Sequence, residues 1–302
     1  MLFRSKGQFD FDGARHELVC QVRKGHKKVF REDGIDYEKL SDHIGKYPVV
    51  IISPTDVDLV KEGSEARRKF FDSIVSQIDS HYLESLLSYQ QTLRQRNGLL
   101  KMFNERGYQD LDLIDSYDQQ LAQTGIVVHR KRKDFIDEFL PVFNSMYNFL
   151  VDEKERARLH YKTEIVDEGQ FVSALKENLR KDMVLQRSTF GIHRDDYEFE
   201  FEFGELRKLG SQGQQKSFLV AIKLAHYDVI KRHKGFNPIL LLDDIFDKLD
   251  DHRIEKLLKR VTSDDFGQLF ITDAGPERTL ELMTKLGIDF ETFNVDNGII
   301  SH

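Results

Sequence analysis

The chain has little of what stabilises secreted or membrane-spanning proteins. Its 302 residues include no tryptophan and one cysteine, Cys20. A single cysteine excludes a framework of intrachain disulfides. No apolar run approaches the roughly 20 residues that a membrane-spanning helix needs. Residues 1–12 lack the apolar core of a secretion signal. We therefore expect a cytoplasmic protein with no membrane partner.

The chain also lacks an excess of positive charge, since its formal net charge is −7. Any contact with DNA must then come from a local basic patch. The densest basic run follows His129 and precedes Asp134, and it consists of Arg130, Lys131, Arg132 and Lys133. This run is either the solvated face of a helix or a sequence-independent contact with DNA phosphates.

A phosphate loop of the form G-x-x-x-x-G-K-[ST] is absent as well. The single Gly-Lys pair is Gly45-Lys46. Leu40 stands where the first glycine is needed, and Tyr47 stands where a hydroxyl-bearing Ser or Thr would hold magnesium. The chain therefore contains no phosphate loop of this type.

The residues that are present predict three parts. Residues 1–63 contain short strand-like runs separated by turn residues. Residues 64–187 carry apolar residues at helical spacing, which predicts an antiparallel helical subdomain with a kink or break at Pro141. Residues 188–302 alternate between strand and helix patterns, which favours a parallel α/β sheet. One strand is predicted by aromatic residues that alternate with glutamates, namely Tyr197, Phe199, Phe201 and Phe203.

Two stretches of this third part carry chemistry. The apolar run Ile239–Leu242 ends in Asp243-Asp244 and predicts a buried parallel strand with two carboxylates at the sheet edge where ligands bind. Carboxylate oxygens are the ligands that Mg²⁺ prefers. Upstream, Ser211–Gln215 precedes an apolar helix, whose first N–H groups suit an anion. The alternatives are a turn cap for the acids and an ordinary helix cap for the serine.

Six segments, in this order, resemble motifs of the RecF family of bacterial DNA replication and repair proteins, which are ATPases of the ABC/SMC type. They are Ile52–Asp56, Gly63–Asp72, Gln95–Lys101, Gly191–Asp196, Ser211–Gln215, and Leu241–Asp244 with Leu249-Asp250. The resemblance implies an α/β fold, namely an ABC/SMC-type head of the P-loop NTPase fold with an inserted antiparallel helical subdomain. In this fold, residues 1–63 and 188–302 form the ATPase lobe and residues 64–187 form the arm.

The resemblance also implies roles for the site residues, with ATP and Mg²⁺ as cofactors. Asp243 would hold Mg²⁺, and Asp244 would orient the attacking water. The signature segment would contact the γ-phosphate of ATP held by a second subunit; its residues are Ser211, Gln212, Gly213 and Gln214. Asp250 would belong to a loop across the dimer interface. Thr272-Asp273 stand where many such heads have a switch histidine.

The implied function is that of an ATP-dependent homodimer that binds single-stranded and gapped or junction DNA. It would work with RecO and RecR to load RecA in recombinational repair and the SOS response. The alternative is a non-catalytic, truncated remnant that acts as a DNA- or protein-binding scaffold; an ABC transporter subunit fits less well. We expect Gly191–Asp196 to have a structural or coupling role rather than to bind a metal.

Because the phosphate loop is missing, we expect that the family's N-terminal segment, with the first strand, that loop and the first helix, is missing from this chain. The chain would then be a fragment, a truncated gene model or a natural shortened form. We therefore expect an exposed apolar face along the sheet and poor solubility.

Overall fold

The computed structural model describes residues 2–11, 13–107, 110–153, 155–202, 204–244 and 249–301. The predicted strand residue Phe203 and the segment 245–248 behind the paired acids lie outside the described residues. The chain forms two compact units, residues 1–48 and residues 49–302. Within the described ranges, no helix is both long enough and apolar enough to span a bilayer.

The first unit is an antiparallel sheet with the strand order β1-β2-β3-β4. Its elements are β1 (Leu2–Phe11), β2 (Ala14–Arg23), β3 (Val29–Glu32), β4 (Ile35–Asp36) and the 3₁₀ helix η1 (Leu40–His43). Two of the short strand-like runs predicted within residues 1–63 correspond to β2 and β3. Strand β1 was not predicted, because its polar and glycine residues have no clear apolar alternation and its pairing with β2 holds it in place.

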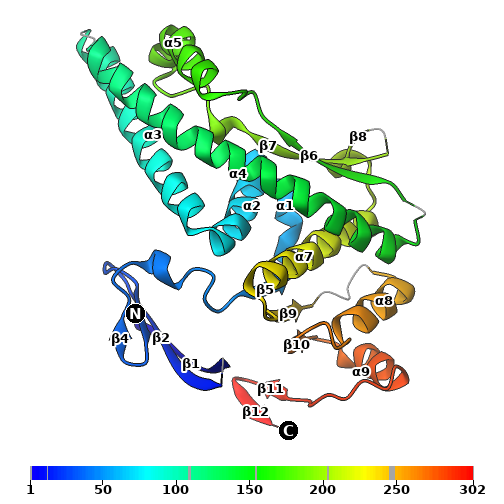
Figure 1. The fold of residues 1–302 in the computed structure, drawn as a ribbon. Coiled ribbons are helices and arrows are strands. Elements are labelled where there is room, and N and C mark those ends of the chain that lie inside the picture. The colour runs from blue at the N-terminus through cyan, green and yellow to red at the C-terminus, as the bar shows by residue number, and fades with distance from the viewer. Residues whose placement is uncertain are drawn as a thin grey trace. The chain divides into compact units, whose positions relative to one another are not determined.

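The centre of the second unit is a parallel sheet with the order β10-β9-β5, as predicted for the third part of the chain. Helix α7 packs against β5 and also against the long helix α4, so it lies between the sheet and the arm (Figure 1). The elements around the sheet are β5 (Val49–Ile52), η2 (Pro54–Val57), α1 (Asp58–Lys61), α6 (Leu206–Leu209), α7 (Gln212–Lys234), β9 (Ile239–Asp243), α8 (Asp251–Val261), β10 (Leu269–Thr272), α9 (Pro276–Lys285), β11 (Asn294–Asp296) and β12 (Ile299–Ser301).

The helical region consists of long neighbouring helices, of which α3 and α4 pack against each other along their length (Figure 1). The helices are α2 (Ser64–Ile78), α3 (Ser80–Arg106), α4 (Leu111–Val151) and α5 (Glu168–Leu185). Of the kink or break expected at Pro141, the break is wrong, because α4 continues through Pro141 to Val151; the kink stays a prediction. Pro141 has no N–H to donate to the backbone oxygen of Asp137, four residues earlier. Because Asp137 is exposed, water reaches this turn.

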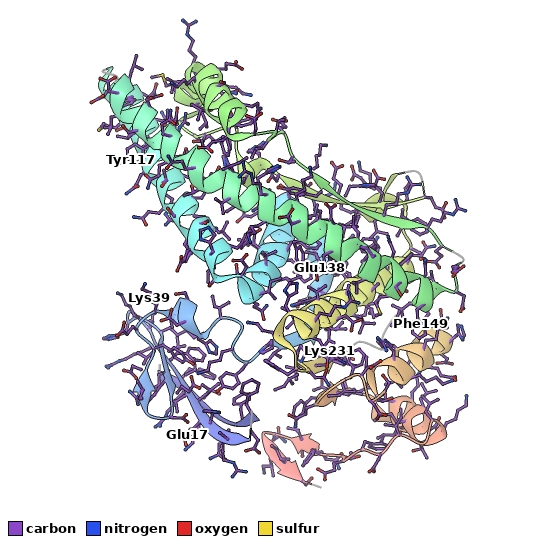
Figure 2. The ribbon with its side chains drawn as sticks, viewed as in Figure 1. Glu17, Lys39, Tyr117, Glu138, Phe149 and Lys231 are labelled. Atoms are coloured by element: carbon purple, nitrogen blue, oxygen red, sulfur yellow. The ribbon has the colours of Figure 1, made fainter. Side chains whose placement is uncertain are left out.

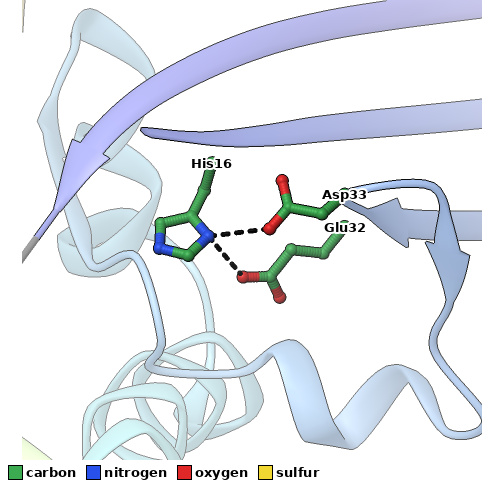
Figure 3. A group of neighbouring side chains, drawn as sticks. All are labelled: His16, Glu32 and Asp33. Atoms are coloured by element: carbon green, nitrogen blue, oxygen red, sulfur yellow. Dashed lines mark hydrogen bonds and ion pairs between the residues drawn. The ribbon is translucent and has the colours of Figure 1, made fainter. Parts of the chain in front are cut away.

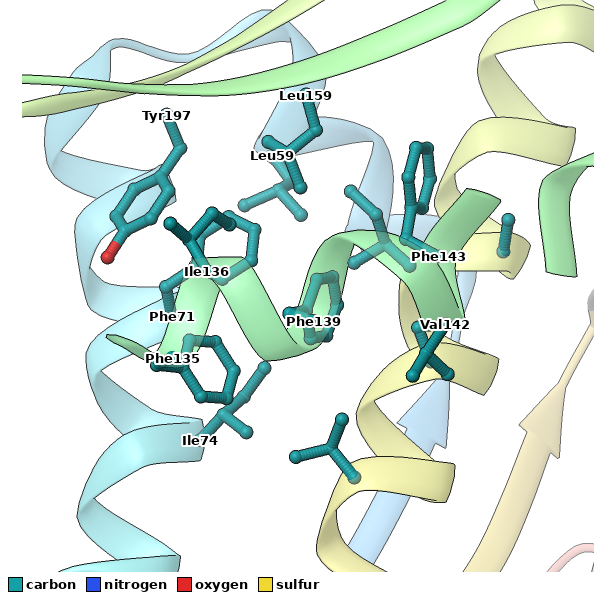
Figure 4. Close-up of a cluster of buried hydrophobic side chains, with 14 of the residues drawn as sticks. Leu59, Phe71, Ile74, Phe135, Ile136, Phe139, Val142, Phe143, Leu159 and Tyr197 are labelled. Atoms are coloured by element: carbon teal, nitrogen blue, oxygen red, sulfur yellow. The ribbon is translucent and has the colours of Figure 1, made fainter. Parts of the chain in front are cut away.

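The core joins the helices to the sheet region. Phe71 of α2 packs edge-on against Phe139 of α4 and stacks on Tyr197 of β7 (Asp196–Phe201), and all three are fully buried (Figure 4). Strand β7 shows the predicted alternation, since every second residue from Tyr197 is buried. The burial of these rings is the main favourable term that holds the arm to the rest of the unit.

One strand lies inside the region predicted to be helical. Strand β6 (Ala157–Lys162) pairs antiparallel with β7, which also pairs with β8 (Gly204–Glu205). The error has a physical cause: β6 gains its hydrogen bonds from a partner about forty residues away, and a local apolar pattern does not report such pairing.

The parallel sheet has one open face. Val50, Ile52, Leu240 and Leu242 point to the buried face. On the other face Ile51, Leu241 and Phe270 are cross-strand neighbours, and Ile51 and Phe270 are 46% and 50% exposed. The expected exposed apolar face is therefore confirmed, whereas the poor solubility stays a prediction.

Candidate functional site

The paired acids lie at the carboxyl end of β9. Asp243 is the last residue of the strand, and both Asp243 and Asp244 are exposed. The hydroxyl of Thr272 on the neighbouring strand β10 donates to Asp243 Oδ1 at 2.6 Å. The N–H of Asp244 donates to the backbone oxygen of Thr272 at 3.0 Å, with Asp244 in the left-handed region at φ 46°. Thr272 thus orients Asp243 from the position where related heads were expected to carry a histidine.

Ser211 is the N-cap of α7. Its Oγ accepts from the N–H of Gln214 at 3.3 Å, and Gln214 Oε1 accepts from the N–H of Ser211 at 2.8 Å. This reciprocal pair is a capping box. It leaves the first-turn N–H groups of Gln212 and Gly213, which have no intrahelical acceptor, at the positive end of the helix. The structural role that the sequence allowed for Ser211 is present, and its signature role stays a prediction.

A cavity of about 180 Å³ brings the two motifs together. Gln212 and Gln215 line it from the start of α7, Asp244 lines it from the end of β9, and Ser53 and Asp56 line it from the end of β5. Ser211 and Asp243 are the immediate chain neighbours of these lining residues. The signature segment and the acids therefore meet at one edge of one sheet, as they must if both belong to one nucleotide site.

Lys223, in the middle of α7, ties the end of β5 to that helix. Its Nζ donates to the backbone oxygen of Ile51 at 2.8 Å and forms an ion pair with Asp56 at 2.7 Å. Asp56 also accepts from the N–H of Ser53 at 2.8 Å. These bonds hold one wall of the cavity in place.

Asp250 caps helix α8, where its Oδ1 accepts from the N–H of Arg253 at 2.8 Å. The guanidinium of Arg253 also pairs with Asp250 Oδ2 at 3.1 Å and donates to Ser217 Oγ at 2.5 Å and to the backbone oxygen of Gly213 at 3.3 Å. Arg253 therefore connects the loop acid to the signature helix. Sequence reasoning missed this residue, because a single arginine three residues after an aspartate carries no signal of what it meets across the fold.

The structure corrects one member of the predicted DNA-contacting run. Arg132 is 1% exposed and pairs with Asp72 and Asp195, each at 2.9 Å. Its guanidinium is unavailable to a DNA phosphate, because one face of α4 is packed against the rest of the unit. Lys131 pairs with Asp79 at 2.8 Å, and only Arg130 and Lys133 are fully exposed.

The segment Gly191–Asp196 joins β7 to three helices. Gly191 has φ 131°, and a Cβ there would lie 2.3 Å from Tyr89 Oη of α3. Tyr89 Oη donates to Nδ1 of His193 at 2.8 Å, and Nε2 of His193 donates to the backbone oxygen of Ser188 at 3.0 Å. Burial lowers the pKa of His193 to about 4, so the ring is neutral and both nitrogens are engaged.

The two acids of this segment bind arginines. Asp195 Oδ2 accepts from Arg132 of α4 at 2.9 Å and from the Tyr161 hydroxyl at 2.6 Å. Asp196 holds Arg67 of α2 through two bonds of 2.8 Å. These geometries support the expected structural and coupling role for the segment.

Among the described residues of the first unit, His16, Glu32 and Asp33 form a cluster with metal-ligand geometry (Figure 3). His16 Nδ1 lies 2.8 Å from Asp33 Oδ2 and 3.6 Å from Glu32 Oε1. Lys46 Nζ already contacts both oxygens of Glu32, at 2.7 and 2.6 Å, so a cation is built into the cluster. The lysine of the lone Gly-Lys pair thus has a structural partner.

The fold and the sheet-edge site define an ATPase head of the ABC/SMC type with an inserted antiparallel helical arm. No family model matches the chain. "DNA replication and repair protein RecF" of Flavobacterium johnsoniae is 46% identical over 279 residues, which are 92% of this chain and 77% of that protein. The protein of the same name in Bacteroides thetaiotaomicron is 41% identical over 290 residues, or 96% of this chain and 78% of that protein.

A solved structure described as "Structure of the recombination mediator protein RecF-ATP in RecFOR pathway" has a TM-score of 0.83 and 26% identity. The match covers 99% of this chain and 79% of that one. A second RecF structure, with ATPrS, gives a TM-score of 0.82 at the same identity. The chain belongs to the RecF family of DNA replication and repair proteins.

Proposed function

We propose that the cavity at the sheet edge is one half of a composite ATP site that closes when two copies of the chain associate. Asp243 would hold Mg²⁺, and Asp244 would orient the attacking water. The start of α7, with Ser211, would meet the γ-phosphate of ATP on the other copy. The single observation that supports this most is the shared cavity, which Asp244 and Gln212 both line.

The wider activity follows from family membership and is likewise a proposal. The protein would bind single-stranded, gapped or junction DNA as an ATP-dependent dimer in the cytoplasm. With RecO and RecR it would support RecA loading and the SOS response. Residues 1–63 and 188–302 would act as the ATPase lobe and residues 64–187 as an arm that couples to it through Gly191–Asp196.

The alternative is a scaffold that binds DNA or protein but hydrolyses nothing. The absence of a phosphate loop favours it, because Asp243 and Asp244 could hold Mg²⁺ and orient water but do not cradle the β- and γ-phosphates. Lys46, the lysine of the lone Gly-Lys pair, is paired with Glu32.

Calorimetric titration of Mg²⁺ and ATP into the chain, with light scattering for its mass, separates the two. A composite site predicts heat and dimer formation that Asp243→Asn abolishes and that Asp264→Asn, an exposed acid outside the cavity, leaves intact. The scaffold predicts no heat and DNA binding that is independent of nucleotide. Heat that survives in Asp243→Asn contradicts the role given to this carboxylate.

A further inference from the structure

The tip of the β2–β3 hairpin carries a group of exposed cations that have no acidic partner among the described residues. All the basic residues of this tip are exposed, namely Arg23, Lys24, His26, Lys27 and Lys28. No acidic residue occurs between Glu17 and Glu32. We call residues 23–28 the hairpin tip.

The nearest acids along the chain are already neutralised. Glu17, which Figure 2 labels in the first unit, pairs with Lys6 at 2.6 Å, and Glu32 pairs with Lys46 at 2.6 Å. Across the described ranges, Arg23, Lys24 and Lys27 have no ion pair, and Lys28 contacts only the face of Phe30, at 5.0 Å from its centroid. The positive charge of the hairpin tip is therefore uncompensated.

The backbone presents these cations on a rigid support. The ten-residue strands β1 and β2 are paired along their whole length, and Leu2 faces Arg23. A hydrogen bond of 3.0 Å from the N–H of His26 to the oxygen of Arg23 closes the turn, with Gly25 at φ 80°. The same sheet carries the exposed Arg4 opposite Gln21, which adds a cation next to the tip.

The helix run 130–133 makes an instructive contrast. Of its four cations, Lys131 and Arg132 have acidic partners within the fold, and Asp134 follows at once. Contacts to a phosphate backbone need cations whose attraction is not already satisfied, since affinity comes from the release of counterions from the nucleic acid. The hairpin tip meets this condition and the helix run does so only in part.

We propose that the hairpin tip is a sequence-independent contact with the DNA phosphate backbone. This deepens the proposed function and rests on its DNA-binding part. Lysine ammonium groups act on phosphates as flexible point charges, so the tip positions DNA without reading bases. Because the net charge of the chain is −7, its association with DNA depends on a local basic surface such as this one.

The test compares two quadruple variants with the same change of charge. One neutralises the tip: Arg23→Gln, Lys24→Gln, Lys27→Gln and Lys28→Gln. The matched control neutralises four exposed cations of the helical region that lie outside the run 130–133: Arg94→Gln, Arg180→Gln, Lys181→Gln and Arg187→Gln. Fluorescence anisotropy with a labelled duplex of random sequence, over a salt series, gives the affinity and its salt slope.

The tip variant should bind at least about tenfold more weakly at 0.1 M salt, and its salt slope should be smaller by about 2 to 3, since about 0.9 counterion is released per phosphate contact. The control should change by less than about threefold, through long-range charge alone. A tip variant in which all three lysines are arginines and Arg23 is kept should retain parental affinity.

Equal losses in both quadruple variants would overturn the proposal, as would an unchanged salt slope in the tip variant. If the parent chain binds no DNA, the proposal for the hairpin tip and the DNA-binding part of the proposed function both fail. The parent chain could instead bind vesicles that contain phosphatidylserine, through the hairpin tip, and show no affinity for DNA. This result would assign the surface to a membrane and also overturn the proposal. All four side chains of the tip are exposed, so circular dichroism should show an unchanged fold.

Discussion

The dipeptide Asp-Asp occurs at two motif positions of this chain, and the fold treats the two pairs in opposite ways. Asp195 and Asp196 bind Arg132 and Arg67 inside the second unit. Asp243 and Asp244 are exposed at the end of β9. Among the described residues, their side chains have no cationic partner, and only the Thr272 hydroxyl bonds to Asp243.

This difference in partners and exposure distinguishes charges that stabilise the fold from charges that are available to a ligand. A buried carboxylate is stable only with a partner, because removing it from water costs several kcal/mol. Arg132 and Arg96, 1% and 0% exposed, satisfy this demand for the arm, where Arg96 pairs with Asp118 at 2.5 Å and Asp182 at 2.7 Å. An exposed pair keeps its lone pairs for ligands from outside, as the exposed cations of the hairpin tip keep their charge. Four measurements would break or sharpen this contrast.

The largest effect is expected for Arg132→Met. The variant leaves Asp72 and Asp195 buried without their cation, so we expect a loss of about 3–5 kcal/mol in the free energy of unfolding, measured with urea. Arg130→Met, two residues away and exposed, should change it by less than about 0.5 kcal/mol. Similar values for the two would mean that the buried pairing does not hold the arm.

The next effect concerns pH. The pKa of His193 is lowered to about 4 by burial, so the unfolded chain binds more protons than the folded one between about pH 6.5 and 4. The stability from the neutral ring is complete above about pH 6.5 and is lost as the pH falls toward 4, by on the order of 3 kcal/mol. His193→Gln should flatten this limb of the urea-unfolding profile, and parallel profiles would contradict the assignment.

Gly191→Ala should cost about 2 kcal/mol, because the residue has φ 131° and the new Cβ would lie 2.3 Å from Tyr89 Oη. Thermal and urea unfolding measure the loss. In the Tyr89→Phe background the clash is relieved and only the backbone strain remains, so the added cost of Gly191→Ala should be smaller there. An equal cost in both backgrounds would show that the close approach to Tyr89 is unimportant.

The smallest effects come from matched changes in the two acid pairs. Asp195→Asn should cost about 1.5–2 kcal/mol, since it removes the charge that accepts from Arg132 and Tyr161. Asp243→Asn should change stability by less than about 0.5 kcal/mol, since the residue is exposed. Equilibrium unfolding of both variants provides the comparison, and a larger loss for Asp243→Asn would reverse the roles given to the two pairs.

Much of the second unit could be predicted from local pattern. The run Ile239–Leu242 predicted β9, the alternation from Tyr197 predicted β7, and the helix after Ser211 begins at Gln212. Strand β6 and the continuation of α4 through Pro141 could not, because each depends on distant partners or on solvent access rather than on its own residues.

The candidate site, like the fold, could be predicted only in part from the sequence. The sequence placed acids after a strand and a serine before a helix, and parallel strands bring such ends to one edge. Thr272, Lys223 and Arg253, which position the site, were not recognised, since each acts through a contact between elements far apart in the chain.

The amino-acid order alone determined the succession of strands and helices and the residue types available for phosphate chemistry, because periodicity and capping are local. Only the tertiary structure decided which charges are free. Arg132 meets Asp72 sixty residues away, a partner that its own neighbourhood in the sequence does not reveal, while the fold brings no acid among the described residues to the hairpin tip. Charge pairing depends on which faces are packed together, and packing is a property of the folded chain.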